Sequence, residues 1–197
     1  MNKRKNIIIL VLVFVLLIGG ASVLYTQLSK VDTPNSLLTQ GDQNEMDDAD
    51  QGDRSSEERQ LTKAPDFTVY DASGSRVNLS EYIGKPIVLN FWASWCGPCQ
   101  SEMPDFHEKY LELGNEIHFL MINMTGGRET LSSAKTFVSE NGYTFPVFYD
   151  TDSDAAMTYS VYSLPTTYFI DAEGYLIAQA TGAISADTLQ RGIDMIK

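Results

Sequence analysis

The two cysteines are the residues whose type and spacing point most directly to chemistry. They are the only cysteines among 197 residues, and they form the segment Cys96-Gly97-Pro98-Cys99. Two thiols at this spacing can close and open a disulfide between themselves, and a thiolate can attack a disulfide on another molecule. The spacing therefore predicts a redox-active dithiol.

A structural staple or a metal site explains the pair less well. A disulfide stabilises a fold most when it closes a long loop, and this one would enclose two residues. A zinc site needs two more ligands, and the two histidines, His107 and His118, are not paired at a finger-like spacing. We therefore expect no metal and no cofactor.

The residues around the pair predict a strand, a turn and the start of a helix. Residues 87–93 are apolar enough for a buried strand, and apolar residues recur at helical spacing from Cys99 to Leu113. Cys96 would then lie at the helix N-terminus, where unpaired N–H groups and the helix dipole stabilise a thiolate. We expect its pKa to fall from about 8.5 toward roughly 7 or below. Pro98 fits the first helical turn, and Cys99 could resolve a mixed disulfide on Cys96.

The rest of residues 64–197 alternates between short apolar runs and amphipathic stretches. The chain then ends on a hairpin around residues 171–174 and a last helix that Ser185 could cap. Strands alternating with helices, followed by a hairpin, predict an α/β domain with a central mixed sheet and helices on both faces.

The N-terminus predicts a membrane anchor over residues 1–28. Lys3, Arg4 and Lys5 precede an apolar run over residues 7–24, about the minimum length that spans a bilayer. The basic flank predicts a cytoplasmic N-terminus and a single-pass protein with its domain outside the cytoplasm. The alternative is a cleaved signal peptide, since Gly19-Gly20-Ala21 offers small residues at a cleavage position.

Residues 29–63 predict an acidic, disordered tether, because they hold few residues that could bury apolar surface. The formal charge of the whole chain is −12, and no cluster of Lys or Arg follows Lys5. Nucleic acid is therefore not an expected partner, since binding to it needs clustered positive charge.

The segment from Phe91 to Cys99 reads Phe-Trp-Ala-Ser-Trp-Cys-Gly-Pro-Cys and resembles thioredoxins. The surrounding chain resembles the membrane-anchored TlpA/ResA-like thioredoxins of bacteria. Three further features carry this resemblance: Ala64-Pro65-Asp66-Phe67, then Glu102 and Pro104, then Leu164-Pro165-Thr166-Thr167. The resemblance covers residues 64–197. It implies a thioredoxin fold with an N-terminal β extension and an αβ insertion, and an extracytoplasmic thiol–disulfide oxidoreductase.

The resemblance also implies a substrate-binding surface next to the cysteines. Pro165 matches the cis-proline that faces the cysteine pair in this fold, and a cis bond is accessible mainly before proline. Leu164 would then present its backbone to an extended protein substrate, beside Trp95. Gly97 and Pro98 complete the expected surface.

Glu102 is the candidate for proton transfer. Asn90 occupies the place where cytosolic thioredoxins resemble one another in having a buried Asp, so another group has to serve. Glu102 follows Cys99 by three residues and shares its helix face, where burial would raise its pKa. The alternative is a solvated helix residue.

Gly97 stands where ResA-like proteins resemble one another in having Glu. We expect this change to weaken the case for a role confined to cytochrome c maturation and to favour a general reductase of exported proteins, recharged by a CcdA-like membrane thiol carrier. The alternatives are a disulfide-forming oxidant of the same fold, a non-catalytic surface binding module and a peroxidase, since Ala-Pro-Asp-Phe also opens peroxiredoxins.

Overall fold

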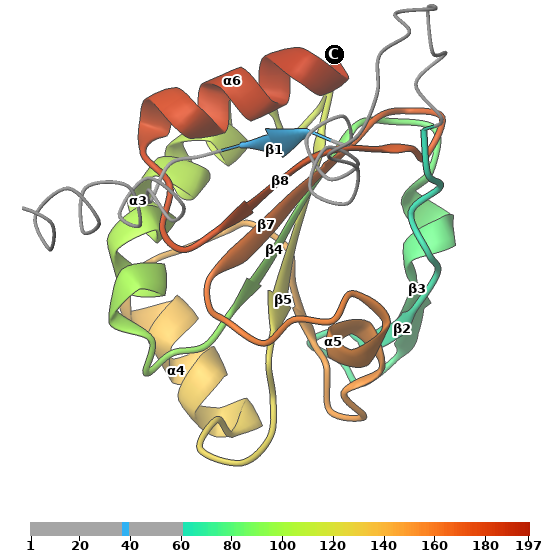
Figure 1. The fold of residues 1–197 in the computed structure, drawn as a ribbon. Coiled ribbons are helices and arrows are strands. Elements are labelled where there is room, and N and C mark those ends of the chain that lie inside the picture. The colour runs from blue at the N-terminus through green and yellow to red at the C-terminus, as the bar shows by residue number, and fades with distance from the viewer. Residues whose placement is uncertain (1–36, 40–60) are drawn as a thin grey trace, which may run out of the picture. The chain divides into compact units, whose positions relative to one another are not determined.

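The computed structural model describes residues 37–39 and 61–197 (Figure 1). These residues form one eight-stranded sheet in the order β1-β8-β7-β4-β5-β6-β2-β3. The strands are β1 (Leu38–Thr39), β2 (Thr68–Tyr70), β3 (Arg76–Asn78), β4 (Ile87–Trp92), β5 (His118–Asn123), β6 (Val147–Tyr149), β7 (Thr166–Ile170) and β8 (Leu176–Thr181). The helices are the 3₁₀ helix η2 (Leu79–Tyr82), α3 (Gly97–Leu113), α4 (Leu131–Glu140), α5 (Asp154–Thr158) and α6 (Ala186–Ile196).

The sheet is mixed, as the sequence predicts. Strands β4, β5 and β6 run parallel, while β7 is antiparallel to β4 and β8 is antiparallel to β7. Strand β4 lies in the middle and is buried along its whole length because strands pair with it on both sides. The segment that leads to Cys96 therefore starts from the middle of the sheet.

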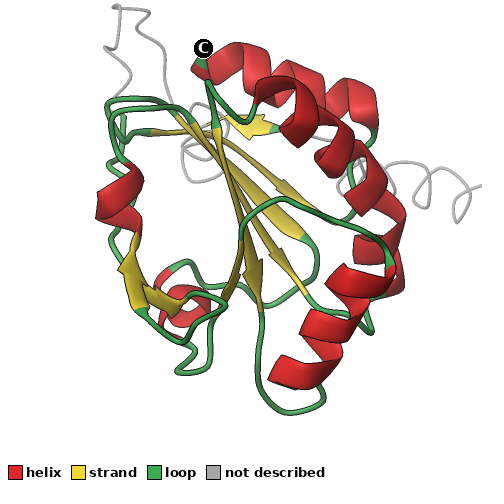
Figure 2. Cartoon of the chain, turned by 180° about the vertical axis from the view of Figure 1, so that it is seen from behind, coloured by secondary structure: helices red, strands yellow, loops and turns green. Residues whose placement is uncertain are grey.

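Helices cover both faces of this sheet (Figures 1 and 2). On one face, α3, α4 and α6 pack over a core that includes Val88, Trp92 and Phe169. On the other face, α5 packs over a second core that includes Leu89 and Phe91. Alternate residues of β4 enter the two cores because successive side chains of a strand point to opposite faces. This arrangement confirms the predicted α/β thioredoxin fold.

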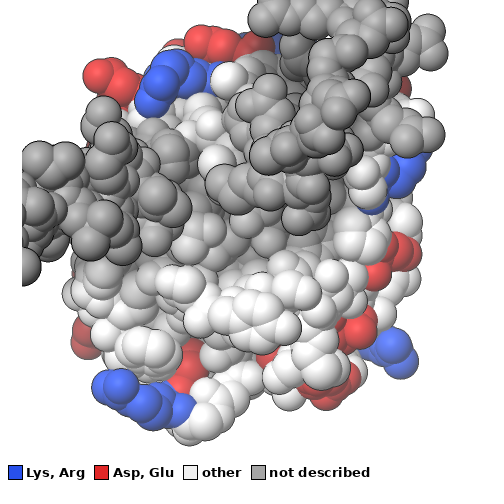
Figure 3. Space-filling view, viewed as in Figure 1, with Lys and Arg blue, Asp and Glu red and all other residues white. Residues whose placement is uncertain are grey.

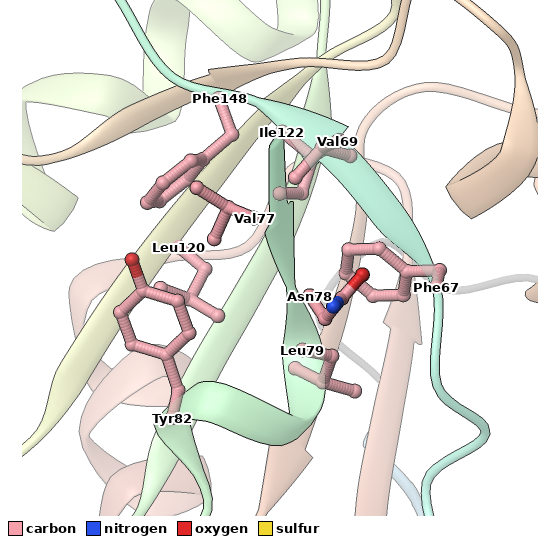
Figure 4. Close-up of a pocket in the computed structure, with 9 residues that line it drawn as sticks. All are labelled: Phe67, Val69, Val77, Asn78, Leu79, Tyr82, Leu120, Ile122 and Phe148. Carbon is pink, nitrogen blue, oxygen red and sulfur yellow. The ribbon is translucent and has the colours of Figure 1, made fainter. Parts of the chain in front are cut away.

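The β2–β3 hairpin is the N-terminal β extension, and it pairs with β6 at the edge of the sheet. Helix α4 and strand β6 lie between β5 and β7 in the chain and add the expected αβ unit. Figure 4 shows apolar side chains of the hairpin, η2 and β5 pointing toward one another. The space between them is too small for a water molecule, so this pocket is packed core.

Two short parts of the expected tether pair with strands of the sheet. Leu38 and Thr39 form β1, which is antiparallel to the edge strand β8, and Leu37 packs against the core on the α6 side. Lys63 pairs with Tyr175, so the domain begins before residue 64. The physical reason is that an edge strand presents unpaired backbone groups, and an apolar Leu-Leu pair gives a passing segment enough contact to use them.

Residues 29–36 and 40–60 of the expected tether and the expected anchor at residues 1–28 lie outside the described residues. Within the part of the chain that the structure describes, no helix combines the length and the apolar character that crossing a membrane requires.

Candidate active site

Cys96 and Cys99 form a disulfide where the central strand gives way to helix α3. The turn between β4 and α3 is closed by the Cys96 N–H, which donates to the Ala93 carbonyl at 3.1 Å. Cys96 caps the helix, and the Cys99 N–H donates to Cys96 Sγ at 3.2 Å. The predicted placement of Cys96 at a helix N-terminus is therefore confirmed.

Both cysteines are buried, and Cys99 is buried more completely. Cys96 is 4% exposed and Cys99 is fully buried, whereas the neighbouring Trp95 ring is 46% exposed. Gly97 and Pro98 lie at the surface as the first residues of α3. An incoming disulfide therefore approaches Cys96 before it could reach Cys99.

The Leu164–Pro165 peptide bond is cis, as the resemblance implied. In the antiparallel pairing of β4 and β7, Phe91 lies opposite Thr166. Pro165 precedes Thr166 and so lies beside the end of β4, where the turn to Cys96 begins. Its carbonyl accepts a hydrogen bond from the Gly182 N–H at 2.8 Å, which ties this loop to the segment after β8.

Glu102 is buried beneath the cysteines, with 2% of its surface exposed. Its Oε1 accepts a hydrogen bond from Asn90 Nδ2 at 2.9 Å, and its Oε2 accepts one from the Ile184 N–H at 2.9 Å. Asn90 Nδ2 also donates to Thr167 Oγ1 at 3.0 Å. Asn90 stands where cytosolic thioredoxins resemble one another in having a buried Asp. It therefore contacts Glu102, the carboxyl group that the sequence proposes for proton transfer instead.

Burial raises the pKa of Glu102 to about 7. The Ile184 and Asn90 hydrogen bonds act in the opposite direction, since they stabilise the charged form, and the nearby charge of Asp105 adds to the rise. A carboxyl group with a pKa near 7 exchanges protons at neutral pH, so this side chain can serve as acid and as base. The structure is that of a buried carboxyl group and not of a solvated helix residue.

One residue at the site was missed by the sequence reasoning. Glu129, in the loop between β5 and α4, is 2% exposed and holds the turn before Cys96. Its Oε2 accepts the Ser94 N–H at 2.6 Å. In the sequence it follows Gly126-Gly127-Arg128 and looks like part of a polar loop, so no periodicity or spacing signals its burial.

The two histidines lie away from the cysteines. His107 contacts Thr144 and the rings of Tyr143 and Phe145, and His118 packs edge-on against Tyr82. On the face shown in Figure 3, the Lys and Arg side chains of the described residues lie apart near the rim.

Comparison with known proteins points to one group. The AhpC/TSA family profile matches residues 61–179. The thiol-disulfide oxidoreductase ResA of Geobacillus kaustophilus is 37% identical over 135 residues, which are 68% of this chain and 76% of that protein. The thioredoxin-like protein YneN of Bacillus subtilis is 31% identical over 133 residues, 68% of this chain and 78% of that protein.

Solved structures agree. The pneumococcal exposed lipoprotein thioredoxin Etrx1 from Streptococcus pneumoniae has a TM-score of 0.59 and 32% identity, and the alignment covers 66% of this chain and 98% of that chain. A thiol:disulfide interchange protein DsbE from Chlorobium tepidum has a TM-score of 0.60 and 29% identity, over 68% of this chain and 94% of that chain.

The fold, the cysteine pair and these relatives define a thiol–disulfide oxidoreductase of the thioredoxin fold. The chain belongs to the AhpC/TSA family and is a member of the ResA-like thioredoxins.

The raised pKa of Glu102 predicts a pH-dependent stability. The folded protein holds this proton up to pH about 7, whereas the unfolded chain releases it near 4.5. The stability linked to this proton is therefore fully present below pH 4.5 and is lost as the pH rises through 7. Relative to Glu102→Gln, the wild-type free energy of unfolding should fall by about 3 kcal/mol between pH 4.5 and 8.

Urea unfolding of both oxidised proteins across this pH range measures the difference. Glu108→Gln, an exposed position on the same helix, is the matched control and should follow the wild-type profile. A constant difference between wild type and Glu102→Gln at every pH would contradict the prediction.

Proposed function

We propose that this protein reduces disulfides of exported proteins, with Cys96 as the nucleophile and Cys99 as the resolving thiol. The observation that carries this proposal is the placement of Cys96 Sγ at the start of α3, where the Cys99 N–H points at it. A donor aimed at this sulfur favours its thiolate, and the thiolate is the attacking species in disulfide exchange.

The reaction begins with the reduced protein. The Cys96 thiolate attacks one sulfur of a substrate disulfide, forms a mixed disulfide, and releases the other substrate sulfur as a thiolate. The Cys99 thiolate then attacks Cys96 Sγ, which closes the Cys96–Cys99 disulfide and frees the second substrate sulfur. The substrate gains two electrons and two protons, and the protein loses them.

The oxidised protein then needs a dithiol donor. A CcdA-like membrane thiol carrier is the proposed source, because it would deliver two electrons from the cytoplasm to a domain outside. It would attack the Cys96–Cys99 disulfide by the same exchange chemistry in reverse.

The proposed substrate-binding surface surrounds Cys96. Trp95 offers an exposed ring, and Gly97 and Pro98 lie at the surface beside the sulfur. Leu164 and the cis-Pro165 lie across from the end of β4, where an extended substrate strand could pair with the Leu164 backbone.

Glu102 is proposed to accept the proton of Cys99 during resolution and to return it when the disulfide is reduced. It lies on the same face of α3 as Cys99. Burial raises its pKa to about 7, so it can accept and release a proton at neutral pH. Because Cys99 is buried from solvent water, a side chain of the protein has to accept its proton.

The alternative is an oxidant of the same fold, which would run the same exchange in the opposite direction. Gly97-Pro98 between the cysteines resembles the reducing members of the thioredoxins, and buried carboxyl groups near the pair disfavour the thiolates that a strong oxidant stabilises. A non-catalytic binding module has no use for this arrangement.

The cysteine assignment is tested by trapping and by reduction. The reduced protein should reduce insulin disulfides rapidly, with a reduction potential near the thioredoxin value of about −270 mV. Cys99→Ala should accumulate mixed disulfides with substrates, whereas Cys96→Ala should accumulate none, because Cys96, at the helix N-terminus and less deeply buried than Cys99, makes the first attack. A potential near −120 mV, typical of a strong oxidant, would favour the alternative.

The Glu102 assignment is tested by kinetics. Glu102→Gln keeps the size and some hydrogen bonding but cannot titrate, so turnover should fall roughly 10²-fold and lose its inflection near pH 7. Capture of mixed disulfides through Cys96 should remain, since the first attack does not need Glu102. Wild-type turnover and an unchanged pH profile would show that the group is only structural.

We also propose that residues 1–28 anchor the protein in the cell membrane, with the domain outside the cytoplasm, and that most of residues 29–63 link the two. The basic, then apolar sequence supports this location. Fractionation should recover the full-length protein with membranes, and protease added to protoplasts should release a fragment cut within residues 40–60. A shorter soluble protein would indicate a cleaved signal peptide instead.

A further inference from the structure

Glu129 is a buried carboxylate at the site that the proposed reaction does not use. Both of its oxygens accept from Ser94 Oγ at 2.9 Å, and Oε2 also accepts the Ser94 N–H at 2.6 Å. Oε1 accepts a further bond from Ser133 Oγ at 2.8 Å. Three donors surround an acceptor with no donor of its own, which matches a carboxylate in its ionised form.

The loop that carries Glu129 is built to hold it in place. Gly126 and Glu129 exchange two backbone hydrogen bonds at 2.9 Å, so the loop closes on itself. Gly127 has a φ of 55°, a left-handed conformation that a glycine adopts without strain. The side chain is therefore fixed by its own loop, by Ser94 and by Ser133.

No cation neutralises this carboxylate among the residues that the structure describes. Its hydrogen-bond partners are a serine backbone and two serine hydroxyls, all of them neutral. The neighbouring Arg128 is exposed, and its guanidinium carbon lies 4.6 Å from the centre of the Trp95 ring. A buried negative charge without a paired cation acts on its surroundings with little compensation.

The hydrogen bonds to Ser94 place Glu129 at the turn that leads to Cys96. Ser94 and Cys96 are two residues apart, so their Cα atoms are separated by at most roughly 7.6 Å. The Cys96 N–H bond to Ala93 folds the turn and brings them closer. Because Glu129 is buried, solvent ions screen its charge less than they would screen an exposed charge.

We propose that Glu129 is a positioning residue that fixes the Ser94–Trp95 turn and, through its charge, opposes the Cys96 thiolate and makes the dithiol more reducing. The reduced protein carries this thiolate, so a negative charge nearby destabilises the reduced form relative to the disulfide. Electrons are then given up more readily to a substrate. The inference rests on the proposed reductase function and assigns the residue that tunes it.

The other polar and charged groups near the cysteines also affect the stability of the Cys96 thiolate. The Cys99 N–H favours the Cys96 thiolate. Arg128, from the same loop as Glu129, also favours it but is exposed to solvent. Glu102, on α3, is neutral or negative near pH 7 and lies on the Cys99 side. Glu129 is therefore the buried charge that opposes the thiolate from the turn side.

Glu129→Gln removes the charge and keeps the shape. Its carbonyl can still accept the Ser94 N–H, and its amide can donate to a serine hydroxyl. In the reduced variant, the midpoint of the pH dependence of Cys96 alkylation by iodoacetamide should fall by roughly 0.4–1.5 pH units. At pH 8, the equilibrium with glutathione should shift roughly 3- to 30-fold toward the reduced protein.

Two matched variants separate charge from position. Glu140→Gln removes one exposed charge from α4 and should shift neither value. Ser94→Ala keeps the Glu129 charge but removes the hydroxyl that bonds both of its oxygens. It should therefore slow substrate reduction while the glutathione equilibrium moves less than in Glu129→Gln. If Glu129→Gln does not fold, Glu129→Asp withdraws the carboxylate from Ser94 and should give a smaller shift of the same sign.

An unchanged alkylation midpoint and glutathione equilibrium in Glu129→Gln, or in Glu129→Asp where the first variant does not fold, would overturn the inference and leave a purely structural residue. This outcome is distinct from failure of the proposed function. An oxidising potential of the wild type would reject the reductase proposal, whereas the shift between wild type and variant tests Glu129 alone.

Discussion

The start of helix α3 directly after the central strand is the constraint on which the rest of the site depends. Strand β4 is paired on both sides and fully buried, so the position of its last residue is fixed by the whole sheet. The helix then begins within a few residues, and Cys96 becomes its cap. A cysteine at this place has an unpaired helix N–H aimed at its sulfur before any side chain contributes. The reactivity of the pair thus comes from the backbone.

The same constraint decides where the two buried carboxyl groups can act. Helix α3 carries Glu102 below Cys99, and burial there raises its pKa to about 7, because two neutral N–H donors do not offset the loss of water. Glu129 holds the turn before Cys96 and accepts hydrogen bonds from three donor groups of two serines. The helix end favours a thiolate on Cys96, and the carboxyl groups oppose an excess of negative charge around it. The proposed reductase would use both effects, since its thiolate has to form and yet give up its electrons.

The sequence predicted the parts of the site that are set by local spacing. The cysteine pair, the strand before it and the helix after it follow from apolar periodicity and from a two-residue gap. The α/β order and the cis-Pro165 followed from the pattern and from the resemblance. Glu102 was predicted because it shares a helix face with Cys99, and its burial is confirmed. These features depend on residues close together in the chain.

The sequence could not predict features that depend on distant contacts. Glu129 is 35 residues from Ser94, and its loop has the composition of an exposed turn. Strand β1 is two residues in an acidic stretch, and its pairing depends on the free edge of β8, about 140 residues further along.

The role of Asn90 also depends on contacts in three dimensions. Its amide can present N–H to an ionised Glu102 or, after rotation, C=O to a protonated one, and its Oδ1 has no partner among the described residues. An Asp at this place would compete with Glu102 for a single proton, because two carboxylates in contact cannot both ionise readily. An asparagine therefore leaves Glu102 as the one titrating group beneath Cys99, which is why the acid can move from the strand to the helix without a second negative charge entering the core.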